Sequence, residues 1–564
     1  MFKKSQNEQV DLFTGLSAQL SKGANKKLMD SRSWNQVFWH HFVSKVDEQP
    51  YEVLYADRMG RPNTPIRQVI GMMVIKELNG WSDEQLFEES MFNLRVRSAL
   101  GIANMDSTPP VASTYYKFRS MLAQYQIDTG KDLIEQTFDQ VSAQQIKELD
   151  ISGQKIRMDS KLIQSNIARQ NRVQLVVEAL RVGIKHIDIS DLLSHVSETQ
   201  RELLTQLQDK STSNVTYPLD KQSKATMLED VGLIIYTMIQ LDMLQPDSTL
   251  YRLYEQQYEQ VDVVDDNDDS DDQATRIQPR DSKTIKSDTI QSVHDQQASY
   301  RKKGKGEHVQ IVKGYHSNIT ETCGEAGQPN LITNVITTPA HVSESDYLQE
   351  AIARSEEKLP ADKAIEEVIT DGGYDSIDNR QAMSQASGMS WKMHKLKGGR
   401  RAYDIYRDDS GALIVKDRKT KEQLTVTWSE KVEKYRVQNS NGTYRYFTKD
   451  QIASYLQSLE FLQNSTDDDY NLRSSVESTI HEVFHRIGRR QKIRYRGLIK
   501  CQWYVLSRAL AVNLNRIGRN IAEKQSKWPI FIFTALMSHL STYVTILFTP
   551  RHRPANTIIL YARL

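Results

Sequence analysis

The chain contains little cysteine and no excess of either charge. Its two cysteines, Cys323 and Cys501, lie far apart among 564 residues. This scarcity makes the cytosol the simplest location. Lys and Arg number 73 against 72 Asp and Glu, so the net charge is only +1. The overall charge therefore gives no reason to expect a polyanionic partner, and any contact with nucleic acid has to come from local clusters of cations.

Long apolar segments are also scarce. The first residues, "MFKKSQNEQVDLF", lack the apolar core of a signal peptide. One uncharged stretch, residues 528–550, is long enough to cross a bilayer. However, it carries Ser538, His539 and further hydroxyl side chains near its centre, and Pro529 breaks its start. We therefore favour a buried terminal helix or helix pair and expect no membrane contact.

The chain is longer than one hydrophobic core usually organises, so we expect several modules. Residues 1–150 predict a helical domain. Residues 65–80 have apolar side chains on one helical face, and Ser82 with Gln85 has the spacing of a capping box that would start one helix through residue 101.

Cations project from this predicted helical domain. Short helices joined by tight turns suit a helix-turn-helix-like DNA reader, with contacts from Arg95, Arg97, Lys117 and Arg119. An ordinary helical bundle with solvated cations explains the same residues, and the local pattern by itself favours that bundle. DNA binding by residues 1–150 is thus a hypothesis that needs support from the rest of the chain.

Residues 151–500 mix strand and helix patterns as an α/β domain does. Residues 154–168 begin with a strand-like alternation that places Asp159 on a strand. Helical stretches follow, and then the acidic run at 261–273, which cannot bury its charge and predicts a solvated linker. We expect residues 170–300, approximately, to form a helical and acidic insertion.

Strand and helix patterns alternate in the next part of this domain. Two β-branched runs, residues 308–320 and 330–340, predict a hairpin, and a helix near 346–357 precedes a strand that ends at Asp371. A helix should start at Ser376, and another strand lies near residues 390–396.

The C-terminal third has a different character. Residues 400–448 alternate like antiparallel strands with Asn-Gly and Asp-Ser turns, which predicts a β-rich insertion. Helices resume near residue 450, and we expect residues 501–564 to be a C-terminal helical region.

The segment "VITDGGYDS" ends a strand on the carboxylate of Asp371. A simple Asp-Gly turn explains it. The alternative is a functional carboxylate at the carboxyl end of a central strand, with Gly372 and Gly373 leaving room for a metal or a phosphate. Asp159 favours the second reading, because a mixed sheet would bring the two acids together.

A third acid comes from the helix predicted at residues 470–484. Tyr470, Arg473 and Glu477 fall on one helical stripe, at i, i+3 and i+7. A surface helix with an ion pair would need solvent, whereas Val476 and its apolar neighbours indicate a largely buried helix. Glu477 therefore joins Asp159 and Asp371 as a candidate.

These segments resemble the DDE-type insertion-sequence transposases, which have an RNase H-like catalytic core. The resemblance runs through "PIRQVIGMMVIKELNGWSDEQLFEE", "MDSKLIQSN", "YRKKGKGEHVQIVKGYHSNITET", "TDGGYDS" and "YNLRSSVE". It implies an α/β fold: an RNase H-like mixed sheet flanked by helices, with a helical N-terminal domain, a helical and acidic insertion and a β-rich insertion. It assigns the catalytic and metal-binding roles to Asp159, Asp371 and Glu477.

The stripe on the last helix is similar to the family's Tyr–Arg–Glu–Lys signature, except that Phe484 occupies the Lys position. The stretch 486–500 has many cations and no acid. It is either a solvated face or a phosphate-contacting surface, and its position after Glu477 favours DNA contact. The expected DNA-binding residues are Tyr470, Arg473, Arg486, Arg489, Arg490, Lys492, Arg494 and Arg496.

The resemblance also implies the chemistry. Three carboxylates would hold two divalent ions about 3.5–4 Å apart, and an all-oxygen site suits Mg²⁺, for which Mn²⁺ can substitute. The partner would be double-stranded DNA, the element ends and the target, bound by a homodimer in the cytoplasm, associated with the nucleoid. Two alternatives remain open: a metal-dependent nuclease or resolvase on the same fold, and an inactive, domesticated DNA-binding relative.

Overall fold

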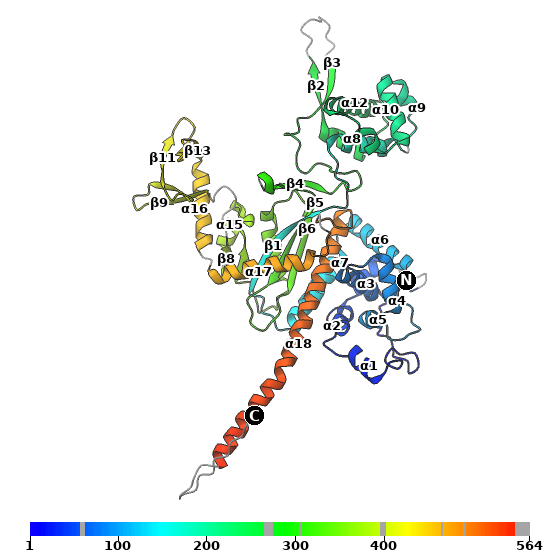
Figure 1. Cartoon of the computed structure of the whole chain (residues 1–564), viewed down its shortest axis with the longest axis vertical. Helices are drawn as coiled ribbons and strands as arrows, with labels where there is room; N and C mark the ends of the chain where they lie inside the picture. The colour runs from blue at the N-terminus through cyan, green and yellow to red at the C-terminus, as the bar shows by residue number, and fades with distance from the viewer. Residues whose placement is uncertain are drawn as a thin grey trace.

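The computed structural model describes the chain with short gaps, over residues 1–56, 62–185, 187–263, 274–304, 306–394, 402–463, 466–488 and 491–547. A central mixed sheet is flanked by helices, two smaller modules stand out from it, and one long helix runs away from the body (Figure 1).

The N-terminal region is helical, as predicted. Gly80 adopts a left-handed conformation (φ 71°) that ends α3, and the capping box of Ser82 and Gln85 starts α4. The expected single helix through residue 101 is wrong, because Asn93 interrupts it and caps a separate α5 with its side chain. The helices are α1 (Lys22–Leu28), α2 (Trp34–His41), α3 (Ile66–Asn79), α4 (Asp83–Phe92), α5 (Leu94–Ala99), α6 (Ala112–Thr129) and α7 (Leu133–Glu148), with short 3₁₀ turns η1 (Val43–Lys45) and η2 (Gln49–Leu54).

The central sheet has the order β4-β5-β1-β7-β8, and β6 also pairs with β5. β1 runs antiparallel to β5 and parallel to β7, which in turn runs parallel to β8. The predicted hairpin is confirmed as β5 and β6. The strands are β1 (Lys155–Gln164), β4 (Ser299–Lys303), β5 (Gln310–Thr322), β6 (Ile332–Pro339), β7 (Glu367–Thr370) and β8 (Ser390–Met393).

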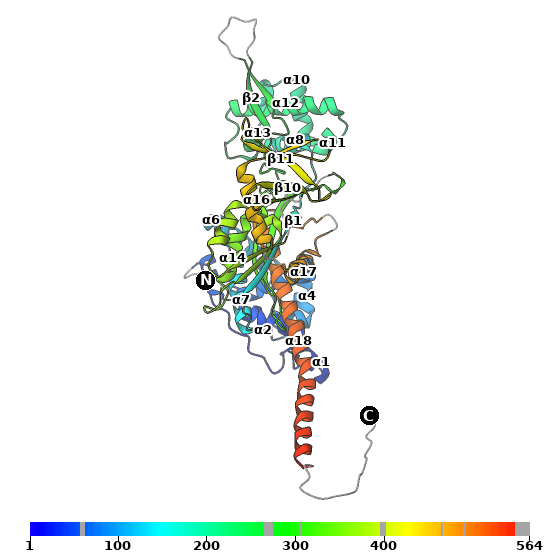
Figure 2. The same ribbon diagram turned by 90° about the vertical axis from the view of Figure 1, so that its left-hand side faces the viewer.

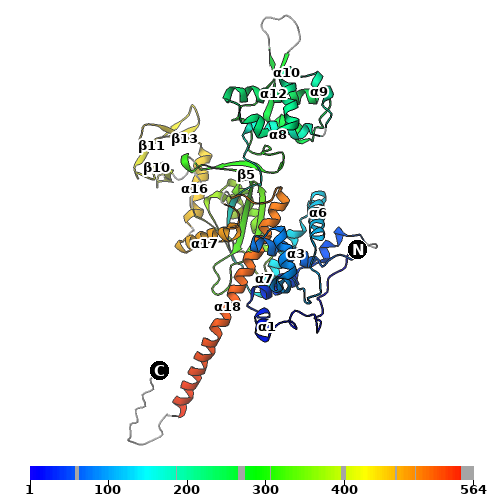
Figure 3. The same cartoon turned by 45° about the vertical axis from the view of Figure 1, so that its right-hand side comes forward.

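Helices cover both faces of this sheet. α17 (Asp467–Phe484) packs against β1 and β7, and the first part of α18 (Leu498–Leu547) lies between β6 and the N-terminal helices α2, α3 and α7 (Figure 3). The other face carries α14 (Leu348–Glu356), preceded by η4 (Glu344–Tyr347). Beyond β7 follow η5 (Gly372–Tyr374) and α15 (Ile377–Gln385), which starts at the predicted cap, Ser376.

The C-terminal half of α18 extends away from the body (Figures 1 and 2). The expectation that Pro529 breaks the start of a terminal helix is wrong, because α18 continues through this residue to Leu547. The predicted burial of 528–550 falls on side chains outside those described. Among the described residues, no helix is both long and apolar enough to cross a membrane.

The first insertion is a separate module with its own hydrophobic core (Figure 1). The acidic run at 261–273 was expected to be a linker. Its first residues, 261–263, belong to β2 (Tyr258–Val263), which pairs with β3 (Ala274–Pro279), and its remaining residues lie outside the described part of the chain. Dense charge had obscured the strand pattern. The helices are α8 (Arg172–Ile184), α9 (Ser190–Ser194), α10 (Glu198–Asp209), α11 (Thr212–Thr216), α12 (Lys221–Gln240) and α13 (Thr249–Gln257).

The alternation of residues 400–448 predicted antiparallel strands, and residues 403–447 form such a sheet, with strands that follow one another in space as in sequence. It packs on α16 (Lys449–Gln463), where the Tyr455 hydroxyl donates to the carbonyl of Tyr403 at 2.9 Å. Its strands are β9 (Tyr403–Arg407), β10 (Leu413–Asp417), β11 (Gln423–Ser429), β12 (Lys434–Gln438) and β13 (Tyr444–Phe447).

Candidate active site

Asp159 lies on β1, in the middle of the sheet, as predicted. Its side chain is 18% exposed, and its Oδ1 accepts a hydrogen bond from the backbone N–H of Ser160 at 2.8 Å. Burial raises the pKa of Asp159 to about 6, and the nearby Asp371 also raises it, whereas Arg473 acts in the opposite direction. The site therefore contains a carboxylate whose negative charge is costly in the absence of a cation.

Asp371 follows the last residue of β7, also as predicted. Parallel pairing aligns Arg157 with Ile369, so the same register carried two residues further places Asp159 opposite Asp371. The Oδ1 atom of Asp371 accepts from the backbone N–H of Gly373 at 2.7 Å, which fixes the start of η5. The two acids therefore lie next to each other, one on β1 and one at the end of the neighbouring strand β7.

The two glycines after Asp371 were expected to leave room for a metal or a phosphate. At Gly373 a Cβ would lie 2.0 Å from the carboxylate oxygen Oε2 of Glu344. The space beside the backbone is thus taken by a side chain from η4. Glu344 was not predicted as a site residue, and no motif in the sequence marks it.

Tyr470, Arg473 and Glu477 lie on one face of α17, as the spacing predicted. Arg473 is largely buried, but the side chain of Glu477 is 67% exposed. Tyr470 is 46% exposed, and its ring lies 4.5 Å from that of His394. The stripe therefore runs along the border between the sheet and solvent.

Arg473 contacts all of the candidate carboxylates. One terminal nitrogen lies 3.4 Å from Asp159 Oδ2 and 3.6 Å from Asp371 Oδ2. The other donates to Glu477 Oε1 at 2.8 Å. These acids raise the pKa of Arg473 despite its burial, so the guanidinium offsets part of the negative charge of the cluster.

The donor set consists of carboxylate oxygens, which suit a hard divalent cation. Over the described part of the chain, no three acidic, histidine or cysteine side chains are already grouped as a metal site. The guanidinium of Arg473 lies between the acids.

Buried ion pairs hold α17 against the sheet. Glu321 on β5 is fully buried between Arg157 on β1, at 2.7 Å, and Arg516 on α18, at 2.5 Å. The hydroxyl of Thr479 on α17 also donates to Glu321 at 2.8 Å. Arg157 reaches α17 directly, because it donates to the carbonyl of Leu472 at 2.6 Å. This network was not predicted, although the alternation of β1 places Arg157 on the same face as Asp159.

The cations after α17 were expected on the same or the next helix. This is wrong for residues 491–496, which form an irregular segment beside the end of β1. Several cations bind backbone carbonyls: Lys492 that of Ile167 at 3.0 Å, Arg496 that of Asn166 at 2.7 Å, and Arg494 that of Trp81.

Arg486, Arg489 and Arg490 follow Phe484, the last residue of α17. Arg486 is exposed and lies next to Gly80, whereas Arg489 and Arg490 lie outside the described residues. Phe484, at the Lys position of the signature, is 4% exposed and belongs to the core shared with the N-terminal helices. A lysine there would have to bury its charge.

The N-terminal cations do not all project. Arg97 is 2% exposed and donates to the carbonyls of Asn104 and Ser107 at 2.6 and 2.8 Å, so its expected DNA contact is wrong. Arg119 is half-buried over the ring of Tyr495. Arg95 and Lys117 are exposed.

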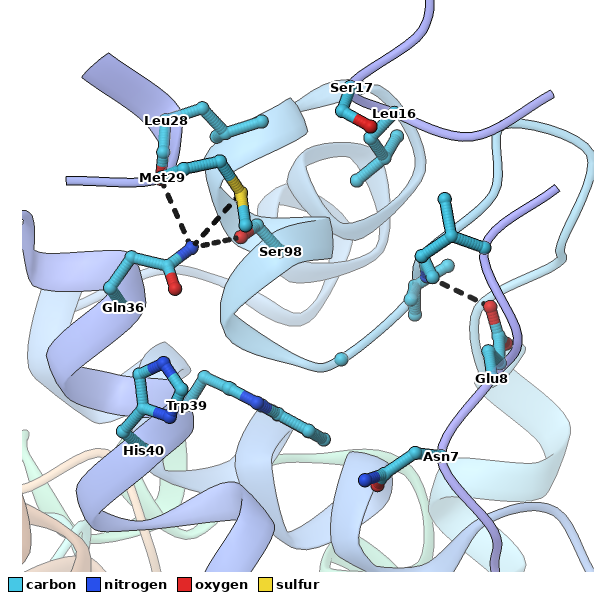
Figure 4. A pocket seen from close by; sticks show the side chains of 14 residues that line it. Asn7, Glu8, Leu16, Ser17, Leu28, Met29, Gln36, Trp39, His40 and Ser98 are labelled. Atoms are coloured by element: carbon cyan, nitrogen blue, oxygen red, sulfur yellow. Dashed lines mark hydrogen bonds between the residues drawn. The ribbon is translucent and has the colours of Figure 1, made fainter. Parts of the chain in front are cut away.

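A pocket of about 310 Å³ lies in the N-terminal region (Figure 4). Gln36 spans part of its wall by donating to the carbonyl of Leu28 and to the hydroxyl of Ser98, each at 3.1 Å. None of the three candidate acids lines it, so it is separate from the carboxylate cluster.

Two family models match the chain. Residues 27–121 match one described as "Transposase domain (DUF772)", and residues 272–514 match one described as "Transposase DDE domain". The chain belongs to the DDE-type insertion-sequence transposases. The transposase is therefore an enzyme of DNA cleavage and strand transfer. Comparisons with curated proteins and with solved structures returned no match.

The matched ranges include Asp371 and Glu477 but not β1 with Asp159. Between the two matched ranges lie β1 and most of the first insertion, which has a hydrophobic core of its own. The pairing of β1 with β5 and β7 brings Asp159 back to the other acids.

Proposed function

We propose that this transposase cleaves and joins DNA with Asp159, Asp371 and Glu477 as its catalytic and metal-binding carboxylates. The observation that carries the proposal is the contact of one guanidinium, that of Arg473, with all of these acids, which come from β1, the end of β7 and α17. Separate parts of the chain thus converge on one cation.

The fold supports this proposal. We propose that the sheet is RNase H-like, since β5 and β6 pair antiparallel with one side of β1 while β7 and β8 continue in parallel on the other. In this arrangement, acids on adjacent central strands face a helix that crosses the sheet. α17 supplies that helix and the third acid.

We propose Mg²⁺ as the metal, with Mn²⁺ as a substitute and two ions per site, held by Asp159, Asp371 and Glu477. When bound, such ions activate the attacking oxygen and stabilise the leaving oxygen of the phosphate. Arg473 has to leave the acids before they can coordinate. Its freed guanidinium would then be placed to contact a DNA phosphate, as the signature implies.

Further DNA contacts are proposed for Tyr470, Arg486, Arg489, Arg490, Lys492, Arg494 and Arg496. Tyr470 is exposed on α17, and Arg486, Arg494 and Arg496 are exposed in the segment that follows it. Lys492, Arg494 and Arg496 would share this role with the backbone contacts described above.

The broader organisation remains a proposal as well. Residues 1–150 would bind the element ends, 151–500 would form the catalytic domain with its insertions, and 501–564 a helical C-terminal region. We propose that the transposase acts as a homodimer on double-stranded DNA at the nucleoid, in the cytoplasm.

The test replaces each acid by its isosteric amide in the full-length transposase: Asp159→Asn, Asp371→Asn and Glu477→Gln. Each variant should lose cleavage of DNA that carries the element ends, because it lacks a metal ligand at nearly constant shape. DNA binding should stay within a few-fold. If a variant retains near-complete Mg²⁺-dependent cleavage, its residue is not part of the triad.

A further inference from the structure

Glu344 is a buried acid next to the proposed catalytic pair. It is the first residue of η4, and its side chain is 13% exposed. Its Oε1 atom accepts from the hydroxyl of Ser160 at 3.1 Å, and Lys303 at the end of β4 lies 3.2 Å from the same oxygen. Ser160 directly follows Asp159 and donates its N–H to that acid.

The other oxygen of Glu344 lies against the turn that carries Asp371. A Cβ on Gly373 would be 2.0 Å from Oε2 of Glu344 and 2.8 Å from Oδ1 of Asp371. Such a separation is far inside van der Waals contact. A methyl group on Gly373 would therefore force the Glu344 carboxylate or the turn to move.

One side chain therefore reaches both acids indirectly. Glu344 accepts a hydrogen bond from Ser160, whose backbone N–H donates to Asp159. Glu344 also lies against Gly373, whose backbone N–H donates to Asp371. His316 adds a further buried contact, since its Nε2 atom is 2.9 Å from the hydroxyl of Ser160.

We propose that Glu344 is a positioning residue that sets the relative placement of Asp159 and Asp371 for metal binding. This inference rests on the proposed function, because it takes these two acids as metal ligands. Glu344 is not a catalytic residue in this assignment, since it acts through Ser160 and Gly373. It also gives a reason for the second glycine of the "DGG" sequence.

A double-mutant cycle tests the contact from both sides in full-length protein. Glu344→Ala should weaken Mn²⁺ binding on the order of 10–100-fold, as loss of an outer-shell partner of a metal ligand does. Gly373→Ala should have a similar effect, because its methyl group displaces the carboxylate. In the Glu344→Ala background the methyl group no longer meets Glu344 and keeps only its 2.8 Å approach to Oδ1 of Asp371, so Gly373→Ala should weaken Mn²⁺ binding less than it does in wild type.

The measurements separate binding from catalysis. Mn²⁺ affinity is read from the electron paramagnetic resonance signal of the free ion, without DNA. The Mg²⁺ concentration for half-maximal single-turnover cleavage should rise more than the maximal rate falls. The Mn²⁺ affinity of Glu344→Gln should lie between those of wild type and Glu344→Ala, because its amide oxygen can still accept from Ser160. This variant replaces Glu344→Ala in the test if the alanine variant does not fold.

Two controls distinguish the possible failures. Asp346→Asn changes an exposed acid in the same η4 turn and should bind Mn²⁺ like wild type. Asp371→Asn should bind Mn²⁺ poorly, and wild-type affinity there would overturn the proposed function itself. If Asp371→Asn loses binding while Glu344→Ala and Gly373→Ala keep it, or if their effects simply add, the positioning role of Glu344 is wrong.

Discussion

Arg473 lies 3.4 Å from Asp159, its partner in the acid cluster, although 314 residues separate them in sequence. The same guanidinium contacts Asp371 and Glu477. In the absence of a metal, this arginine supplies the positive charge that three neighbouring acids need. Under the proposed function, a metal and this arginine would be alternative partners of the same oxygens.

The first prediction follows from this competition. Arg473→Gln should bind Mn²⁺ more tightly than wild type, on the order of tenfold, because no cation has to be displaced. Its thermal stability in EDTA should fall, because the acids then repel one another. Isothermal titration and thermal unfolding with and without metal measure both effects. Arg519→Gln, at an exposed ion pair of α18, is the control, and weaker metal binding by Arg473→Gln would show that the arginine supports the site.

A second prediction concerns pH. The pKa of Asp159 is raised in the folded protein to about 6 from the ordinary value of 3.8, so the folded state binds more protons than the unfolded state between these values. The stability linked to this proton is present at low pH and is lost as the pH rises through about 6. Asp159→Asn should therefore stabilise the metal-free protein at pH 7.5, by up to about 3 kcal/mol.

That gain should disappear below about pH 4, where Asp159 is protonated in both states. Unfolding in EDTA at a series of pH values measures it. The exposed Asp346→Asn provides the comparison. A gain that does not change with pH would mean that burial does not control the charge of Asp159.

Glu321 provides a third prediction, about stability. Glu321→Ala leaves the buried Arg157 and Arg516 without their shared acid, and loss of one partner of a buried ion pair costs about 3–5 kcal/mol. Denaturant unfolding should show this loss, and cleavage should fall because α17 loses the contact of Thr479. Glu350→Ala, at a half-exposed ion pair on α14, should change stability little. Equal effects of the two variants would contradict the network's role.

The fourth prediction separates two N-terminal arginines. Arg95→Gln with Lys117→Gln should weaken DNA binding and lower the slope of log affinity against log salt by about 0.9 for each phosphate that is no longer neutralised, with stability unchanged. Arg97→Gln should instead lower stability, because the carbonyls of Asn104 and Ser107 lose the donor that the buried Arg97 supplies. Fluorescence anisotropy at several salt concentrations and thermal unfolding distinguish these results. If the double variant binds DNA like wild type, Arg95 and Lys117 do not contact DNA, and another part of the chain recognises it.

Local patterns determined much of this protein. The period of apolar residues and the cap at Ser82 predicted α3 and α4, and the strand that ends at Asp371 was recognisable because β-branched residues precede an Asp-Gly turn. Spacing alone also placed Tyr470, Arg473 and Glu477 on one face of α17, since helical geometry relates neighbouring turns.

Tertiary packing decided the rest. Arg97 and Arg95 lie two residues apart in sequence, yet one is buried and the other exposed, because only the folded chain brings the carbonyls of 104 and 107 to the first. The same holds for Glu344, whose significance comes from lying against Gly373. The chemical types of the acids and Arg473 were visible in the sequence. Which of them touch depends on strand pairing and helix packing between residues hundreds of positions apart, and no local pattern records those distances.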